Sequence, residues 1–128
     1  MSLTIMTTFC FNNAEYPFDV RDADDAEKME IATEHMQAEE KQLPKDGKTS
    51  VILKSHCMLI KTYFDDIFGK DAGVKICGER NNLNAHYEAY DAFLDLVRVQ
   101  KDALVARGNS YKKYSNRAQR RHPEDVSK

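Results

Sequence analysis

The sequence predicts a mainly α-helical (α+β) fold, in which an N-terminal β-hairpin packs on a three-helix core. Three observations support this prediction. Ser50–Gly69 is the most apolar long segment of the 128-residue chain, and apolar residues recur at helical spacing before and after it. The chain has no Trp, five Gly and three Pro, a composition that argues against a turn-rich sandwich or barrel. A chain of this length can bury a core without disulfides or metals.

The hairpin is predicted from Thr7–Val20, where aromatic residues alternate with others on both sides of Asn12 and Asn13. Two adjacent asparagines tolerate the positive φ values of a tight turn. Pro17 has no N–H for a central ladder, so we expect the second strand to be an edge. An isolated hairpin is marginal in water, so we expect its aromatic side chains to pack on the helices. They are Phe9, Phe11, Tyr16 and Phe18.

The first helix is predicted over residues 22–42. Asp22 is suited to cap its N-terminus, and the acidic residues just after it favour the positive end of the helix dipole. Pro44 stops the helix. Its apolar stripe is thin, and the rest of its surface is strongly acidic, so self-association through this helix is one expectation. The stripe consists of Ala26, Met29, Ala32, Met36 and Leu43.

The second helix is predicted over Ser50–Phe68, with Thr49 and Ser50 capping its start and Gly69 at its C-terminal cap. Apolar residues cover most of its circumference, so we expect it to be central and buried. Within it, Cys57 resembles a small buried hydrophobe.

A short helical turn near residues 74–77 and a third helix from about Leu83 to Arg107 complete the predicted elements. The third helix carries an apolar stripe interrupted by Lys101, and Gly108 is expected to end it. The prediction is therefore one globular domain over residues 1–108 and a basic, mobile tail over residues 109–128. The stripe consists of Leu83, Tyr87, Tyr90, Leu94, Val97 and Leu104, and Phe93 and Val105 widen it.

Charge is distributed unevenly between these two regions. Residues 1–108 contain 13 Lys/Arg and 19 Asp/Glu, whereas residues 109–128 contain 6 and 2. Such a tail is typical of an interaction segment, and it could equally dock on its own acidic body. Basic residues interleaved with Tyr111 and Tyr114 also leave open an alternative, a nucleic-acid-associated or regulatory protein that uses the tail.

Several classes of function find little support in the sequence. The three cysteines form no CxxC pair, and the four histidines lack the ExxH spacing of a di-metal helical bundle, so no metal or cofactor is expected. No catalytic set is visible, and we expect a protein that is not an enzyme. No apolar run approaches the length of a membrane span, and the N-terminus lacks a signal-peptide pattern, so a cytoplasmic location is expected.

The motifs together resemble a known family. An F-x-F-N-x-x-E-Y-x-F-D hairpin is followed by FDDIFG (Phe64–Gly69), ICGERNNL (Ile76–Leu83) and a terminal YSNRAQRR (Tyr114–Arg121). This pattern is similar to a family of small proteins encoded in the tail modules of phages and prophages of Gram-positive bacteria. The resemblance covers nearly the whole chain, although the family often has Gly in the hairpin turn where this chain has Asn13 and Ala14.

The resemblance implies a tail assembly chaperone, a cytoplasmic protein that holds tail components such as the tail-tube or tape-measure protein before assembly. Exposed apolar surface would then recognise aggregation-prone segments of those proteins. The most specific motifs of the resemblance are FDDIFG and the terminal NRAQRR. The expected partner contacts are the charged residues of these motifs, namely Asp65, Asp66, Arg117, Arg120 and Arg121.

Overall fold

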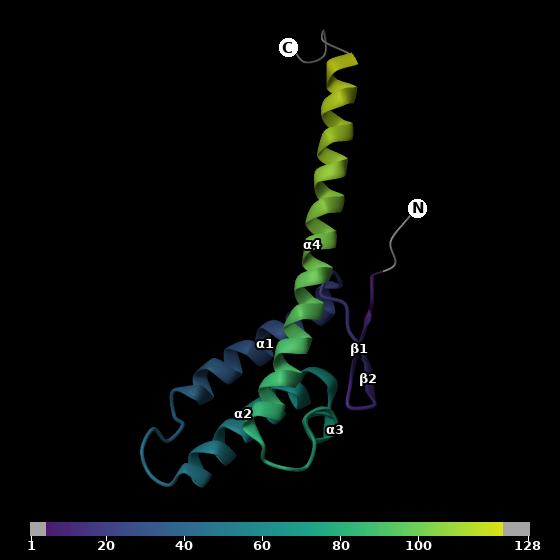
Figure 1. The fold of residues 1–128 in the computed structure, drawn as a ribbon. Helices are drawn as coiled ribbons and strands as arrows, with labels where there is room; N and C mark the ends of the chain where they lie inside the picture. The colour runs from purple at the N-terminus through teal and green to yellow at the C-terminus, as the bar shows by residue number, and fades with distance from the viewer. Residues whose placement is uncertain (1–4, 122–128) are drawn as a thin grey trace.

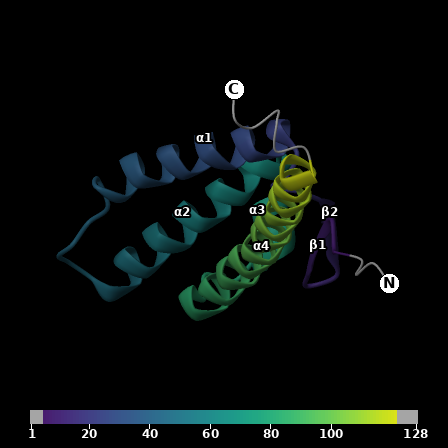
Figure 2. The ribbon, with the colours of Figure 1, turned by 90° about the horizontal axis from the view of Figure 1, so that it is seen from above.

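The fold is mainly helical with an N-terminal hairpin, as predicted, in a computed structural model that describes residues 5–121 (Figure 1). The hairpin and three helices form a compact body, from which the last helix runs outward as a single shaft. Seen from above, α1, α2 and α4 spread side by side, and the hairpin lies on the opposite side of α4 from α1 (Figure 2). The elements are β1 (Thr8–Phe11), β2 (Ala14–Pro17), α1 (Ala23–Glu40), α2 (Thr49–Phe68), α3 (Ala72–Cys77) and α4 (Leu83–Arg121).

The hairpin is confirmed in both its turn and its packing. Asn12 and Asn13 have φ values of 50° and 63°, and the antiparallel register places Phe9 opposite Tyr16. Two successive positive φ values match the right-handed twist of the strands. Phe9 is buried in the core, and Phe18, which lies just after β2, is buried with it. The hairpin therefore contributes its aromatic face to the core.

The core is an aromatic cluster at the centre of the body. Phe93 of α4 makes edge-to-face contacts with Phe9, Phe18 and Phe64, at ring-centroid distances of 5.3, 5.0 and 5.8 Å. These rings come from the hairpin, the segment after it and α2, so one side chain joins three parts of the chain. Edge-to-face pairs add about 0.5–1.5 kcal/mol each beyond the area they bury.

Helix α2 packs against α1, α3 and α4, which confirms its central position. Its start differs from the prediction. Lys48 occupies the N-cap position without a side-chain capping bond, and Thr49 already lies in the helix. Its end agrees with the prediction in that Gly69 has a positive φ of 107° and its N–H donates to the Asp65 carbonyl at 2.8 Å. The predicted cap of α1 is confirmed, because the Asp22 carboxylate accepts from the N–H of Asp24.

The expectation that α2 is buried around most of its circumference is wrong for its first half. Val51, Leu53 and Met58 are 50%, 38% and 63% exposed, whereas the buried side chains cluster between Cys57 and Ile67. The contacts that Gly73 of α3 and Phe93 of α4 make with this helix fall in its second half, at Asp65 and Phe64. Met58 is left exposed beside α1.

The predicted end of the last helix at Gly108 is also wrong, since α4 continues through it to Arg121. Gly108 does not have a positive φ, and it lies inside α4 as an ordinary helical residue. A helical glycine costs only about 1 kcal/mol relative to Ala. No Pro occurs between Gly108 and Pro123 to stop the helix. Residues 109–121 are therefore helical in the structure, and residues 122–128 of the predicted tail lie outside the described residues.

The apolar stripe predicted for this helix is confirmed in part, since Phe93 and Val97 are buried and Leu83 and Tyr90 pack against the core. The residues that face the core are His86, Ala89, Phe93, Val97 and Gln100, whereas Tyr87 and Leu94 are partly exposed. Counting apolar residues alone missed the two polar side chains in the buried line. Among residues 5–121, no helix combines the length and the apolar character that a membrane crossing requires.

Candidate binding groove between α1 and α2

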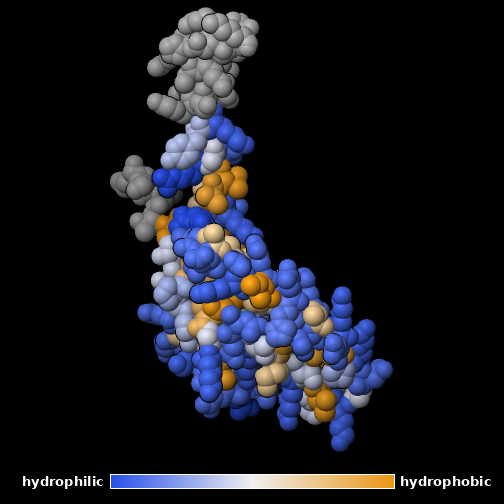
Figure 3. Space-filling model, turned by 180° about the vertical axis from the view of Figure 1, so that it is seen from behind, coloured by the Kyte–Doolittle hydropathy of each residue, from blue (hydrophilic) through white to orange (hydrophobic). Residues whose placement is uncertain are grey.

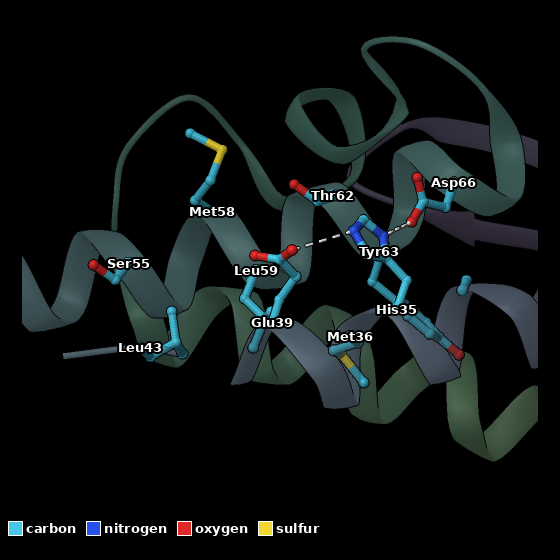
Figure 4. A pocket seen from close by; sticks show the side chains of 11 residues that line it. His35, Met36, Glu39, Leu43, Ser55, Met58, Leu59, Thr62, Tyr63 and Asp66 are labelled. Atoms are coloured by element: carbon cyan, nitrogen blue, oxygen red, sulfur yellow. Dashed lines mark hydrogen bonds and ion pairs between the residues drawn. The ribbon is translucent and has the colours of Figure 1, made fainter. Parts of the chain in front are cut away.

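An open groove lies between α1 and α2, with a cavity of about 270 Å³ (Figure 4). Its α2 side is formed by residues between Ser55 and Asp66, which belong to the middle and the second half of that helix. Met58 projects away from the helix pair in Figure 4, and its high exposure confirms that it is available for contact. The apolar lining consists of Ala32, Met36, Leu43, Met58, Leu59 and Tyr63.

One rim of the groove carries a histidine between two carboxylates. The Nδ1 atom of His35 lies 2.7 Å from the Asp66 carboxylate, and its Nε2 atom lies 3.6 Å from that of Glu39 (Figure 4). The hydrogen bond to Asp66, together with the charges of Asp66 and Glu39, raises the pKa of His35 above its ordinary value of 6.5. The group joins α1 to the last turn of α2 and places polar atoms beside the apolar lining.

We expect a measured pKa above 6.5 for His35, from an NMR titration of its imidazole ring. Because the folded-state pKa is raised, the pair stabilises the fold below pH 6.5, and this contribution is lost as the pH rises through the folded pKa. Asp66→Asn should return the pKa towards 6.5. The matched control is Asp65→Asn, which removes the same charge one residue away. An equal fall in the control would show that His35 senses general charge and not the Asp66 contact.

The two adjacent aspartates predicted as partner contacts face different neighbours. Asp65 accepts a hydrogen bond from the Gly73 N–H at 2.7 Å, so its carboxylate anchors α3 to α2. Asp66 faces the groove and pairs with His35. The structure thus brings Asp66 to the groove and gives Asp65 a part in the fold. Arg117, Arg120 and Arg121 lie on the outer length of α4, and their side chains fall outside the part of the structure that is described.

The two buried cysteines of the body are held as thiols, and the buried His86 is held as neutral imidazole. Cys57 and Cys77 are buried, and desolvation raises the pKa of both thiols, that of Cys77 to about 12. Desolvation also lowers the pKa of His86, whose Nδ1 atom lies 2.6 Å from the Asn82 carbonyl oxygen. At neutral pH the cysteines are thiols, which are poor nucleophiles and metal ligands. Within residues 5–121, no three His, Cys, Asp or Glu side chains are grouped to hold a metal ion.

Sequence reasoning missed most of the groove. The pairing of His35 with Glu39 was visible as a contact across one helix turn, but Asp66 is 31 positions away and could not be assigned to it. The available signal was an imbalance in apolar surface. The second helix is apolar around most of its circumference, whereas the first offers only a thin Ala and Met stripe to cover it.

Comparison with known proteins yields one family. Residues 12–124 match the model of a family described as "Family of unknown function (DUF6673)". The match spans the hairpin turn, helices α1 to α3 and the length of α4 with its basic end. No curated protein and no solved structure matches the chain.

Proposed function

We propose that this chain, which belongs to the DUF6673 family of unknown function, is a non-enzymatic binding protein of phage or prophage tail assembly. It acts as a chaperone that holds an apolar helical segment of a tail component in the groove between α1 and α2. The observation that carries the proposal is the apolar lining of this groove, in which Met58 is 63% exposed. The link to phage tails comes from the sequence resemblance.

The shape of the groove suits a helical ligand. Two neighbouring helices with an apolar floor and polar rims are the usual receptor for one amphipathic helix, which inserts side chains one turn apart. The floor is formed by Met36, Leu59 and Tyr63, and Asp66 and Glu39 stand at the rim. A bound helix would therefore present apolar residues to the floor and basic or hydrogen-bond donor residues to the rim.

The chemistry of the floor suits a chaperone. Met36 and Met58 contribute flexible thioether side chains that repack against differently shaped apolar partners. Surfaces of this kind tolerate sequence variation in the ligand, whereas a rigid pocket selects one shape. A protein that holds tail components before assembly needs to bind aggregation-prone segments and then release them.

The proposal is tested by co-expressing the full chain with the tail-tube and tape-measure proteins of the same tail module. We expect one of them to co-purify and to gain solubility. Met58→Glu, at a side chain that is 63% exposed, should abolish the complex without unfolding the protein. Val74→Glu is the matched control, because Val74 is exposed on α3 away from the groove. The proposal fails if neither protein binds, or if both variants bind equally.

A second candidate, a nucleic-acid-associated or regulatory protein, is favoured by the helical presentation of the basic segment on α4. If about five of its charges contacted phosphates, log affinity would fall with log salt concentration at a slope of roughly −4. Fluorescence anisotropy with labelled DNA and RNA measures this slope. Absence of binding at low salt removes this candidate and leaves the groove proposal unaffected.

A further inference from the structure

The outer half of α4 extends beyond every other element of the body (Figure 1). We call residues 101–121 the α4 extension. Its 21 residues span about 30 Å at 1.5 Å per residue. Helix stability in proteins comes mainly from packing of an amphipathic face. The extension would therefore gain stability from a surface that covers its apolar side chains.

The buried stripe of α4 continues along the extension without a cover. Val97 and Gln100 are 5% and 0% exposed, whereas Leu104 and Tyr111, farther along the same helix face, are 50% and 63% exposed. Leu104 and Tyr111 are two turns apart and so lie one above the other. Figure 3 shows hydrophobic side chains exposed on this shaft as well as on the body. The face that packs on the body near Phe93 is thus left open beyond Gln100.

Basic residues accompany this open stripe. Lys101, Arg107 and Lys112 are exposed, and the guanidinium carbon of Arg107 lies 5.9 Å from the centroid of the Tyr111 ring. Over residues 101–121 the sequence has seven Lys or Arg and one acidic residue, Asp102. Pairing two extensions with each other would place like charges along both flanks of the seam, which opposes that arrangement. The partner surface should therefore be acidic, helical and about 30 Å long.

Helix α1 has these properties. It contains seven acidic residues and one lysine in 18 residues, and it is about 27 Å long. Glu27, Glu30, Ile31 and Glu34 are exposed on its outer surface, and we call them the acidic face of α1. Ile31 is 57% exposed, with the carboxylates of Glu27, Glu30 and Glu34 on one side of it and Lys28 on the other. The acidic face of α1 complements the extension in charge, in length and in its apolar residue.

We propose that the α4 extension of one copy packs along the acidic face of α1 in a second copy. Leu104 and Tyr111 cover Ile31, and Arg107 and Lys112 pair with Glu30 and Glu34. Each copy has one extension and one acidic face, so two copies can satisfy both contacts in a closed dimer. The contact uses the outer surface of α1 and not the groove, so it is independent of the proposed role in tail assembly.

The test is the mass of the full chain in solution, measured by light scattering and analytical ultracentrifugation at low and high salt. We expect a mass of about twice 14.7 kDa at low salt and a shift towards monomer at high salt, because salt screens exposed ion pairs. The double variant Glu30→Lys/Glu34→Lys and the double variant Arg107→Glu/Lys112→Glu should each be monomeric. A mixture of the two should form a heterodimer, since each reversed surface then meets its complement.

Two controls separate this contact from a general effect of charge. Glu88→Lys/Asp91→Lys makes the same charge change on an exposed part of α4 within the body and should dimerise like the unmodified chain. Leu104→Gln should weaken dimerisation about tenfold without any charge change, as expected for one apolar contact at the centre of an interface. A monomer at low salt, unchanged dimerisation of both reversed variants, or no recovery on mixing overturns the proposal. The proposal would also be overturned if the chain were monomeric and bound nucleic acid, because the extension would then have a different partner.

Discussion

Gly73→Ala should destabilise the protein by about 3 kcal/mol, the upper part of the range for overpacked sites. A Cβ at position 73 would lie 2.6 Å from the Cα and 2.7 Å from the carbonyl carbon of Lys61, and closer still to its carbonyl oxygen. All three are backbone atoms of α2, so no side-chain rotation can relieve the contact. The short helix α3 would have to move away from α2, and the bond from the Gly73 N–H to Asp65 would be stretched.

Urea denaturation followed by circular dichroism measures this loss as a change in the free energy of unfolding. Gly108→Ala is the matched control, because it makes the same substitution in a helix where an added Cβ has no neighbour within 4 Å. Replacing a helical glycine by alanine ordinarily stabilises by about 0.5–1 kcal/mol, so the control should gain helix content and lose no stability. Equal stabilisation of both variants would mean that α3 does not approach α2 closely.

The glycines show how much of the fold the sequence could predict. Gly69 and Gly78 end helices and have φ values of 107° and 91°, as the pattern indicated for Gly69. Gly108 has a similar sequence context but lies inside α4, and Gly73 lies inside α3 because no other residue fits against Lys61. A helix end, a helix interior and a close backbone approach all permit glycine. Local sequence alone cannot separate these cases, since they differ in the tertiary contacts that the glycine makes.

The pair Asp65 and Asp66 illustrates the same limit for the candidate site. Two negative charges near the C-terminal end of a helix oppose its dipole, which made these residues conspicuous in the sequence. The structure offsets each charge with a partner from another element, the Gly73 N–H for Asp65 and His35 for Asp66. The FDDIFG motif made both residues candidates for a partner contact. It could not indicate that one stabilises the fold and the other borders the groove.

The apolar imbalance between the first two helices was the strongest sequence signal for the groove. Apolar periodicity tells which face of a helix avoids water, but not whether another element is large enough to cover it. Here α3 and α4 cover the half of α2 that ends at Phe68, and the thin stripe of α1 leaves Met58 exposed. Burial was therefore predicted correctly for Phe64 and wrongly for Met58, which lines the candidate site.

Gln100→Leu should destabilise the protein by about 2–4 kcal/mol, because it leaves several buried backbone groups without partners. The Gln100 amide is fully buried, and its Oε1 atom accepts from the Val20 N–H at 2.8 Å. Its Nε2 atom donates to the carbonyl oxygens of Phe18 and Met6, also at 2.8 Å each. One side chain of α4 thus holds both ends of the hairpin. Leucine has a similar volume but can make none of these bonds.

The loss should appear as a lower free energy of unfolding in urea and as faster hydrogen exchange of the Val20 amide, while α1 and α2 keep their protection. Gln100→Glu is the informative control. The ionised carboxylate would still accept from Val20 but would face two carbonyl oxygens, so its pKa should be raised in the folded state. Its stability should therefore recover as the pH falls and the acid becomes a donor. If Gln100→Leu were as stable as the unmodified chain, the hairpin would be held by its aromatic contacts and by the hydrogen bond from Asn12 to the Ile76 carbonyl.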